Sequence, residues 1–132
     1  MNDQPSSTGL EPNIAAALAY LAGPLSGVLV LVVERNSRFV RFHALQSIVG
    51  LGGLWLLAGA FGLLAVLTVF VSATGFAVLL YAAWVTGAAW IVVWLVCLVK
   101  AYSGQAWKLP LAGKYAERWS VPSTSPPASS IP

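Results

Sequence analysis

The stretch Glu34–Ser47, ERNSRFVRFHALQS, is the charged interruption between two long apolar runs of this 132-residue chain. Asn36 and Ser37 are N-cap candidates, so a helix is predicted to begin near Arg38, with its first turn at a membrane surface. Arginines interleaved with phenylalanine and valine are typical of a helix start in the lipid headgroup zone. We therefore place this segment, called the basic hinge (residues 34–47), at a membrane interface.

A polar stripe follows on the same predicted helix. His43, Gln46 and Ser47 fall at i, i+3 and i+4, so they share one face. Such groups are costly in hydrocarbon unless they have partners, so we expect the stripe to point into a helix bundle and form interhelical hydrogen bonds. Alternatively the stripe is a functional site, with His43 as a proton carrier or an axial ligand to a metal or tetrapyrrole, or it is simply exposed to solvent.

Composition assigns the chain to the membrane proteins. It is 58% hydrophobic and 8% charged, with a mean hydropathy of +0.81. Apolar runs longer than about 18 residues are typical of transmembrane helices. We predict an all-α integral membrane protein with three transmembrane helices, an interfacial hinge and a C-terminal amphipathic surface helix. The predicted spans are about 14–33, 44–71 and 76–99, within a membrane domain of residues 13–119.

The ends of the chain are predicted to lie outside the membrane core. Residues 1–12 form a polar N-terminal tail, and residues 108–119 read as the amphipathic helix on the membrane surface. Residues 120–132 are rich in Ser and Pro and are expected to be disordered.

Small residues at helical spacing predict close helix packing. Gly23-Pro24 is also expected to loosen or kink the first span, because proline removes a backbone donor. The predicted packing residues are Ala15, Ala19, Gly23, Gly27, Gly52, Gly59, Ala83 and Gly87.

The positive charges predict the topology. The net charge is +3, and all seven Lys and Arg lie in the hinge or after the third predicted span. Three spans put both groups on one side, which the positive-inside rule makes cytoplasmic. The N-terminus and the Ser72–Gly75 loop are then outside, and the C-terminus lies in the cytoplasm, at a bacterial inner membrane. Anionic lipid, and not nucleic acid, is the expected partner of Arg35, Arg38, Arg41, Lys100, Lys108, Lys114 and Arg118.

A family resemblance is carried by three short motifs. They are Tyr20-Leu21-Ala22-Gly23-Pro24, the hinge with Arg38-Phe39-Val40-Arg41-Phe42-His43-Ala44, and Lys108-Leu109-Pro110 with Gly113. The chain resembles small uncharacterised prokaryotic membrane proteins related distantly to the import-channel subunit of the chloroplast inner envelope. The resemblance implies a multi-helix membrane protein without known catalysis and a link to protein translocation.

The function predicted from these features is non-catalytic. General acid–base or nucleophilic chemistry needs at least two positioned reactive groups, and the sequence offers one His, one Cys and four separated carboxylates. We expect an accessory or scaffold subunit of a larger membrane complex, respiratory, photosynthetic or translocation, acting through helix packing and anionic-lipid contact. The alternative is a homo-oligomeric channel or translocation component. No cofactor or metal is expected, apart from the His43 alternative above.

Overall fold

A computed structural model describes residues 5–110 and 112–120 of the chain. Within these ranges the secondary structure is entirely helical. The elements, in chain order, are α1 (Pro12–Leu21), α2 (Pro24–Val33), α3 (Arg38–Gln46), the π-helix η1 (Ser47–Leu51), α4 (Gly52–Thr68), α5 (Ala73–Tyr102) and α6 (Ala112–Trp119). The tail predicted to be disordered lies outside the described residues except for Ser120, as do residues 1–4 of the N-terminal tail.

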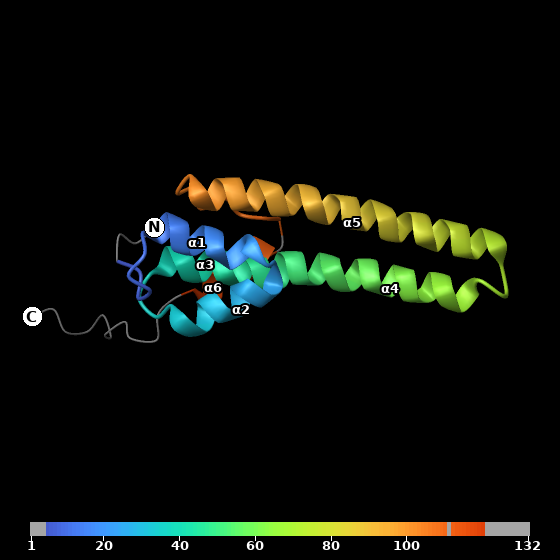
Figure 1. Ribbon diagram of the computed structural model, residues 1–132, viewed down its shortest axis with the longest axis horizontal. Coiled ribbons are helices and arrows are strands. Elements are labelled where there is room, and N and C mark those ends of the chain that lie inside the picture. The colour runs from blue at the N-terminus through green and yellow to red at the C-terminus, as the bar shows by residue number, and fades with distance from the viewer. Residues whose placement is uncertain (1–4, 111, 121–132) are drawn as a thin grey trace, which may run out of the picture.

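A long helical hairpin runs the length of the molecule (Figure 1). One arm is the continuous helix Arg38–Thr68, of 31 residues, and the other is α5, of 30 residues. Each is about 45 Å long at 1.5 Å per residue. Among the described residues, these two helices are long and apolar enough to cross a membrane. Most of their side chains are not buried by protein, which is expected of helices that face lipid.

The first arm begins where the sequence predicts. Ser37 is the N-cap of α3, and its hydroxyl accepts a hydrogen bond from the Val40 backbone N–H at 3.4 Å. Ser72 caps α5 in the same way, accepting from the Gly75 N–H at 3.0 Å. The predicted polar interruption near Ser72 is therefore the tight turn between the two arms.

The predicted first span is not one continuous helix. Residues 14–33 are divided between α1 and α2, each of ten residues, which fold back on each other. The chain reverses at Gly23, whose φ of 63° is in the left-handed region that favours glycine. Pro24 then starts α2, because proline is well suited to the first turn of a helix. At about 15 Å each, α1 and α2 are too short to cross a hydrocarbon core of roughly 30 Å.

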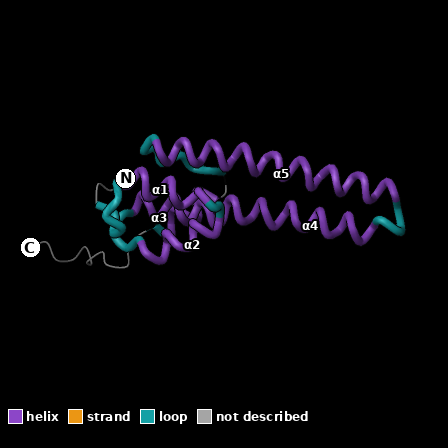
Figure 2. The backbone as a smooth tube through the Cα atoms, in the orientation of Figure 1, coloured by secondary structure: helices purple, strands orange, loops and turns teal. Residues whose placement is uncertain are grey.

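The N-terminal segment consequently returns to the hinge. The Ser7 backbone N–H donates to the Glu34 carboxylate at 3.0 Å. Both ends of the α1–α2 hairpin thus lie at one end of the molecule, as Figure 2 shows. The prediction that the N-terminal tail and the basic hinge lie on opposite sides is wrong, because it assumed an unbroken helix through Gly23.

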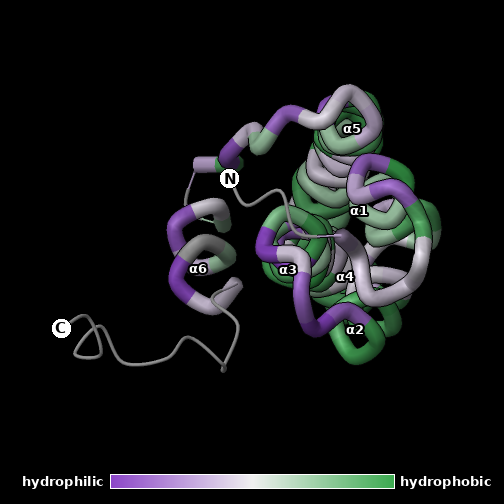
Figure 3. The backbone as a smooth tube through the Cα atoms, turned by 90° about the vertical axis from the view of Figure 1, so that its left-hand side faces the viewer, coloured by the Kyte–Doolittle hydropathy of each residue, from purple (hydrophilic) through white to green (hydrophobic). Residues whose placement is uncertain are grey.

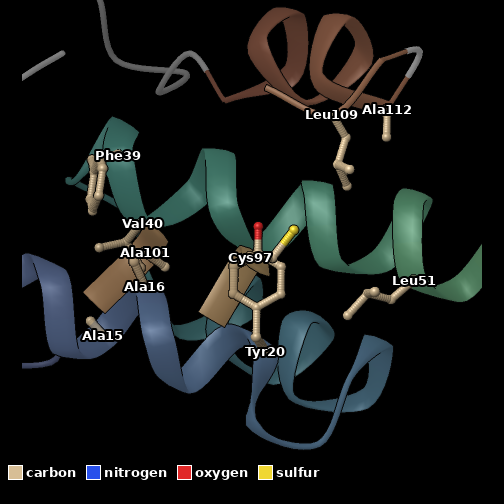
Figure 4. Close-up of a cluster of buried hydrophobic side chains, with 10 residues drawn as sticks. All are labelled: Ala15, Ala16, Tyr20, Phe39, Val40, Leu51, Cys97, Ala101, Leu109 and Ala112. Carbon is tan, nitrogen blue, oxygen red and sulfur yellow. The ribbon is translucent and has the colours of Figure 1, made fainter. Parts of the chain in front are cut away.

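The buried core lies at this same end, which we call the basic end. Here α1, α2, α3, η1 and the last turns of α5 meet around Tyr20 and Cys97 (Figure 4). Ala65 is the buried residue of α4, so the other end of the molecule is little more than two paired helices. The molecule is therefore broad at the basic end and narrow at the turn between α4 and α5.

Helix α6 adds to the broad end. It packs beside α3, on the opposite side from α1 (Figure 3). Gly113 lets the start of α6 pass close to the segment before it, because a Cβ there would lie 2.8 Å from the Lys108 Cβ. Tyr115 and Trp119 are exposed, 58% and 71% respectively, and leave an aromatic surface at the level of the hinge.

Candidate functional site

The hinge carboxylate organises the surface of the basic end. Glu34 is fully buried, and its oxygens accept hydrogen bonds from the Ser6 hydroxyl, from the Ser7 hydroxyl and N–H, and from the Asn36 and Ser37 backbone N–H groups. Burial alone would raise the pKa of Glu34, but the hydrogen bonds from Ser6, Ser37, Ser7 and Asn36 outweigh it and lower the pKa from 4.5 to about 2. The ionised carboxylate therefore fastens the N-terminal segment to the hinge.

Gln46 is the centre of a buried polar network. Its Nε2 donates to the Trp107 carbonyl at 3.0 Å and to the Tyr20 hydroxyl at 3.3 Å, and its Oε1 accepts from the Leu109 N–H at 3.3 Å. One side chain of α3 thus joins α1 to the segment that follows α5. The Lys108-Leu109-Pro110 motif has a structural meaning here, since its backbone is held by Gln46.

His43 lies in the same network, surrounded by aromatic rings. Its Nδ1 is 3.1 Å from the Tyr20 hydroxyl, and the rings of Tyr20, Phe39 and Phe42 meet it edge-on, with centroids at 5.7, 4.6 and 5.2 Å. The buried Nε2 has no hydrogen-bond partner among the described residues. Within the described part of the chain, no group of three or more His, Cys, Asp or Glu is placed to hold a metal ion.

Ser47, the third member of the polar stripe, holds the α1–α2 turn. Its hydroxyl donates to the Gly23 carbonyl at 2.8 Å. Ser26 completes the turn by accepting from the Ala22 N–H at 3.0 Å and donating to the Ala19 carbonyl at 3.1 Å. Non-helical backbone is tolerated at membrane depth only where its N–H and C=O groups have hydrogen-bond partners. The Ser26 and Ser47 hydroxyls provide such partners at this turn.

Two tryptophans of α5 secure the same region. The Trp94 indole N–H donates to the Tyr20 carbonyl at 2.7 Å, and the Trp90 indole N–H donates to the Leu51 carbonyl at 2.9 Å. Leu51 ends the π-helix, where the altered backbone pattern frees a carbonyl. The Trp90 and Trp94 rings stack with centroids 6.1 Å apart, and the Trp90 ring covers Gly23. The mid-span position of these indoles is explained by their carbonyl acceptors.

The predicted lipid-contacting cations gather at the basic end. Arg41 donates from Nη1 to the Glu34 carbonyl at 2.8 Å, and Lys100 donates to the Gln105 side chain at 2.8 Å. The Nε atoms of Arg38 and Arg41 are buried and have no partner in the described chain. Exposed side chains at this end include those of Arg35, Lys108, Lys114 and Arg118.

The predicted packing residues fall into two groups. Ala15 and Ala19 are buried, and Gly27 is in close contact with α3, since a Cβ there would lie 2.9 Å from the Ala44 carbonyl oxygen. Gly52 faces Pro24 at 3.4 Å. Gly59 and Gly87 have open space where a Cβ would be, and Ala83 and Gly87 line an apolar groove of about 590 Å³ between α4 and α5.

Sequence reasoning did not identify several members of the site. Tyr20 was notable only as part of a family motif, and Ser26 and the Trp107 carbonyl were not singled out. Periodicity also does not show where the carbonyl acceptors of the Trp90 and Trp94 indoles lie. A tyrosine three residues before a glycine–proline pair is the signal that could have pointed to this turn.

Comparisons with known proteins identify relatives of the whole region. Residues 11–116 match the magnetosome magnetite crystal formation protein family. A UPF0132 membrane protein of Methanocaldococcus jannaschii is 38% identical over 118 residues, covering 87% of this chain and 94% of the relative. A UPF0132 membrane protein of Archaeoglobus fulgidus is 37% identical over 109 residues, covering 83% and 95% respectively. No solved structure matches the chain.

These matches correct the resemblance drawn from the motifs. The matches are a magnetosome protein family and archaeal membrane proteins, and none links the chain to the import-channel subunit of the chloroplast envelope. The expected link to protein translocation is therefore withdrawn. The motifs are better explained by packing, because Tyr20, the hinge and the Lys108-Leu109-Pro110 segment meet at Gln46.

Proposed function

The chain belongs to the magnetosome magnetite crystal formation protein family, and from this premise we propose that it is a non-catalytic scaffold of a biological membrane. Its basic end sits among anionic headgroups, and its long hairpin crosses the bilayer. The observation that carries the proposal is the polar network around Gln46. Its groups are used to hold helices together, as a structural role requires, instead of lining a cavity that could admit a substrate.

Anionic-lipid contact is supported by the arginines of α3. Arg38 and Arg41 lie three residues apart at the start of α3, and both side chains are half-buried. A lipid phosphate can bind the accessible part of these guanidinium groups, because guanidinium and phosphate form charge-assisted hydrogen bonds. The positive-inside rule places this end on the cytoplasmic side.

The family name suggests where such a scaffold acts. It refers to magnetite crystal formation, whereas the names of the archaeal relatives refer only to membranes. A role common to all of them is the organisation of the membrane itself. We propose that, in the family members that take part in crystal formation, such a scaffold organises the membrane around the forming crystal. It acts either alone or as an accessory to a larger complex.

The test is to purify the protein from native membranes in mild detergent and identify co-purifying subunits and lipids by mass spectrometry. We expect retained anionic phospholipid. Arg38→Gln with Arg41→Gln should lower that retention several-fold, while Arg35→Gln, at an exposed side chain, should lower it less. Equal lipid retention in the wild type and the double variant would contradict the proposed contact. Ion flux in liposomes made with the purified protein would favour the channel alternative.

A further inference from the structure

The geometry points to a curved bilayer as the partner of this protein: we propose that the chain is a rigid wedge that favours membranes whose leaflet at the basic end is convex. The inference rests on the proposed function in one respect, the seating of the basic end among headgroups. It adds a shape preference that neither the family nor the relatives' names assign.

The first step is the depth of the α1–α2 hairpin. Lys100 and the hinge mark the headgroup level at the basic end, and Ser72 marks the far turn. The α5 residues 73–99 span about 40 Å, whereas α1 and α2 each reach about 15 Å from the hinge. The hairpin therefore occupies one leaflet and stops short of the other.

The second step is that apolar surfaces are found at both depths. Leu21, Leu25 and Leu29 of the short hairpin are exposed at 64%, 73% and 68%, as expected of side chains that face lipid. In the far leaflet no other helix of the described residues covers α4 and α5, and a Cβ added at Gly59 or Gly62 would meet nothing within 4 Å. Each helix has a diameter of about 10 Å, so α1, α2 and α6 greatly enlarge the cross-section at the basic end alone (Figure 1).

The third step is rigidity, because a hairpin that could straighten would not act as a wedge. The turn is fastened by Ser47 from the first arm and by Trp94 from the second, at 2.8 and 2.7 Å. Gly27 allows α2 to lie directly on the α3 backbone. The glycine at the reversal has a positive φ, so the turn is also favoured locally.

Charge sets the direction of the wedge. The Lys and Arg of the described residues lie at the broad end or in the segments attached to it, so the broad end stays at the headgroups. Inserting more protein into one leaflet expands that leaflet, which bends the bilayer toward it, as for amphipathic helices that enter a single leaflet. With the basic end cytoplasmic, the favoured shape is a vesicle or bud whose outer surface faces the cytoplasm.

The experiment reconstitutes the full chain at low density into vesicles of equal lipid composition, extruded to small and large diameters. A membrane-impermeant amine reagent then reports whether the lysines of the basic end face outward. We expect the outward fraction to be at least about twofold higher in small vesicles than in large ones. The same outward fraction at both diameters would overturn the proposal.

The matched variants are Gly23→Ala with Pro24→Ala, which favours one continuous helix, and Gly59→Ala, the same change where a Cβ meets nothing. The double variant should lose the curvature preference, and Gly59→Ala should keep it. Because the double variant could misfold, the wild-type comparison is decisive alone.

A second copy that fills the far leaflet through the 590 Å³ groove would also abolish the preference and overturn the wedge. Loss of anionic-lipid retention would instead count against the proposed function.

Discussion

At the scale of single residues, Gln46 has an importance that its position in a moderately polar stripe does not suggest. Three groups from other segments depend on it: the Tyr20 hydroxyl, the Trp107 carbonyl and the Leu109 N–H. Gln46 and Tyr20 are both fully buried, so solvent cannot replace the bond between their side chains. Leaving a buried polar group without its partner costs more free energy than the hydrogen bond contributed to stability.

We therefore predict that Gln46→Leu lowers the free energy of unfolding by about 2–3 kcal/mol. The measurement is a denaturation curve in mixed micelles. Thr86→Val is the matched control, because the Thr86 hydroxyl bonds only to the Ala82 carbonyl of its own helix, at 2.8 Å. Thr86→Val should lower the free energy of unfolding by less than about 0.5 kcal/mol. Equal losses for the two variants would show that Gln46 does not join the segments.

Single residues also show what the sequence could predict. Asn36 and Ser37 were the N-cap candidates, with a helix start predicted near Arg38. The structure has Ser37 as the N-cap and begins α3 at Arg38, as expected because capping depends on a few neighbouring residues. The partners of Gln46 lie 26 to 63 residues away in sequence. Periodicity indicates which way such a side chain points, but not what meets it there.

At the scale of elements, the N-terminal segment is held by a carboxylate and should respond to pH. The pKa of Glu34 is lowered in the folded protein, from 4.5 to about 2. A lowered carboxylate pKa stabilises the folded form above pH 4.5, and that contribution is lost as the pH falls toward 2. The contribution is on the order of 3 kcal/mol when fully present.

We expect an N-terminal fluorescent label to gain mobility between pH 4.5 and 2, and Glu34→Gln to show high mobility already at neutral pH. Glu11→Gln changes a carboxylate that is exposed and should behave like the wild type. A label whose mobility stays constant across this range in the wild type would show that Glu34 does not fasten the segment.

The elements themselves were predicted unevenly. The two long helices follow from apolar length, which is a strong signal. The prediction of one continuous helix for the first span was wrong because Gly23-Pro24 is compatible with both a kink and a reversal. The choice between them is made by Ser47, 24 residues after Gly23, and by Trp94, 74 residues after Tyr20. Local sequence cannot decide between two outcomes that differ only in tertiary contacts.

At the scale of the whole molecule, the reversal changes the topology. A three-span chain would place Leu10 and Ser72 on the same side of the membrane. The structure places the segment before α1 at the basic end and the turn between α4 and α5 at the far end (Figure 1). The charge distribution alone could not distinguish these arrangements, because the described residues before the hinge carry no Lys or Arg.

We predict that Leu10→Cys and Ser72→Cys, each in a Cys97→Ala background, react with impermeant maleimides from opposite sides of sealed vesicles. Cys97 is buried and is the single native cysteine, so the background change removes ambiguity. Ser103→Cys, at the end of α5, marks the basic end and should label together with Leu10→Cys. Labelling of Leu10→Cys from the Ser72 side would restore the three-span topology.

The bond from Trp94 to the Tyr20 carbonyl also has a consequence for biosynthesis. The ribosome makes Tyr20 long before Trp94, which is 74 residues later. Until α5 emerges, the turn at Gly23 lacks an indole that it needs in hydrocarbon, and two Gln46 partners, the Trp107 carbonyl and the Leu109 N–H, have not yet been made. We expect the N-terminal hairpin to wait at the membrane surface during translation and to sink into the lipid last, although it is synthesised first.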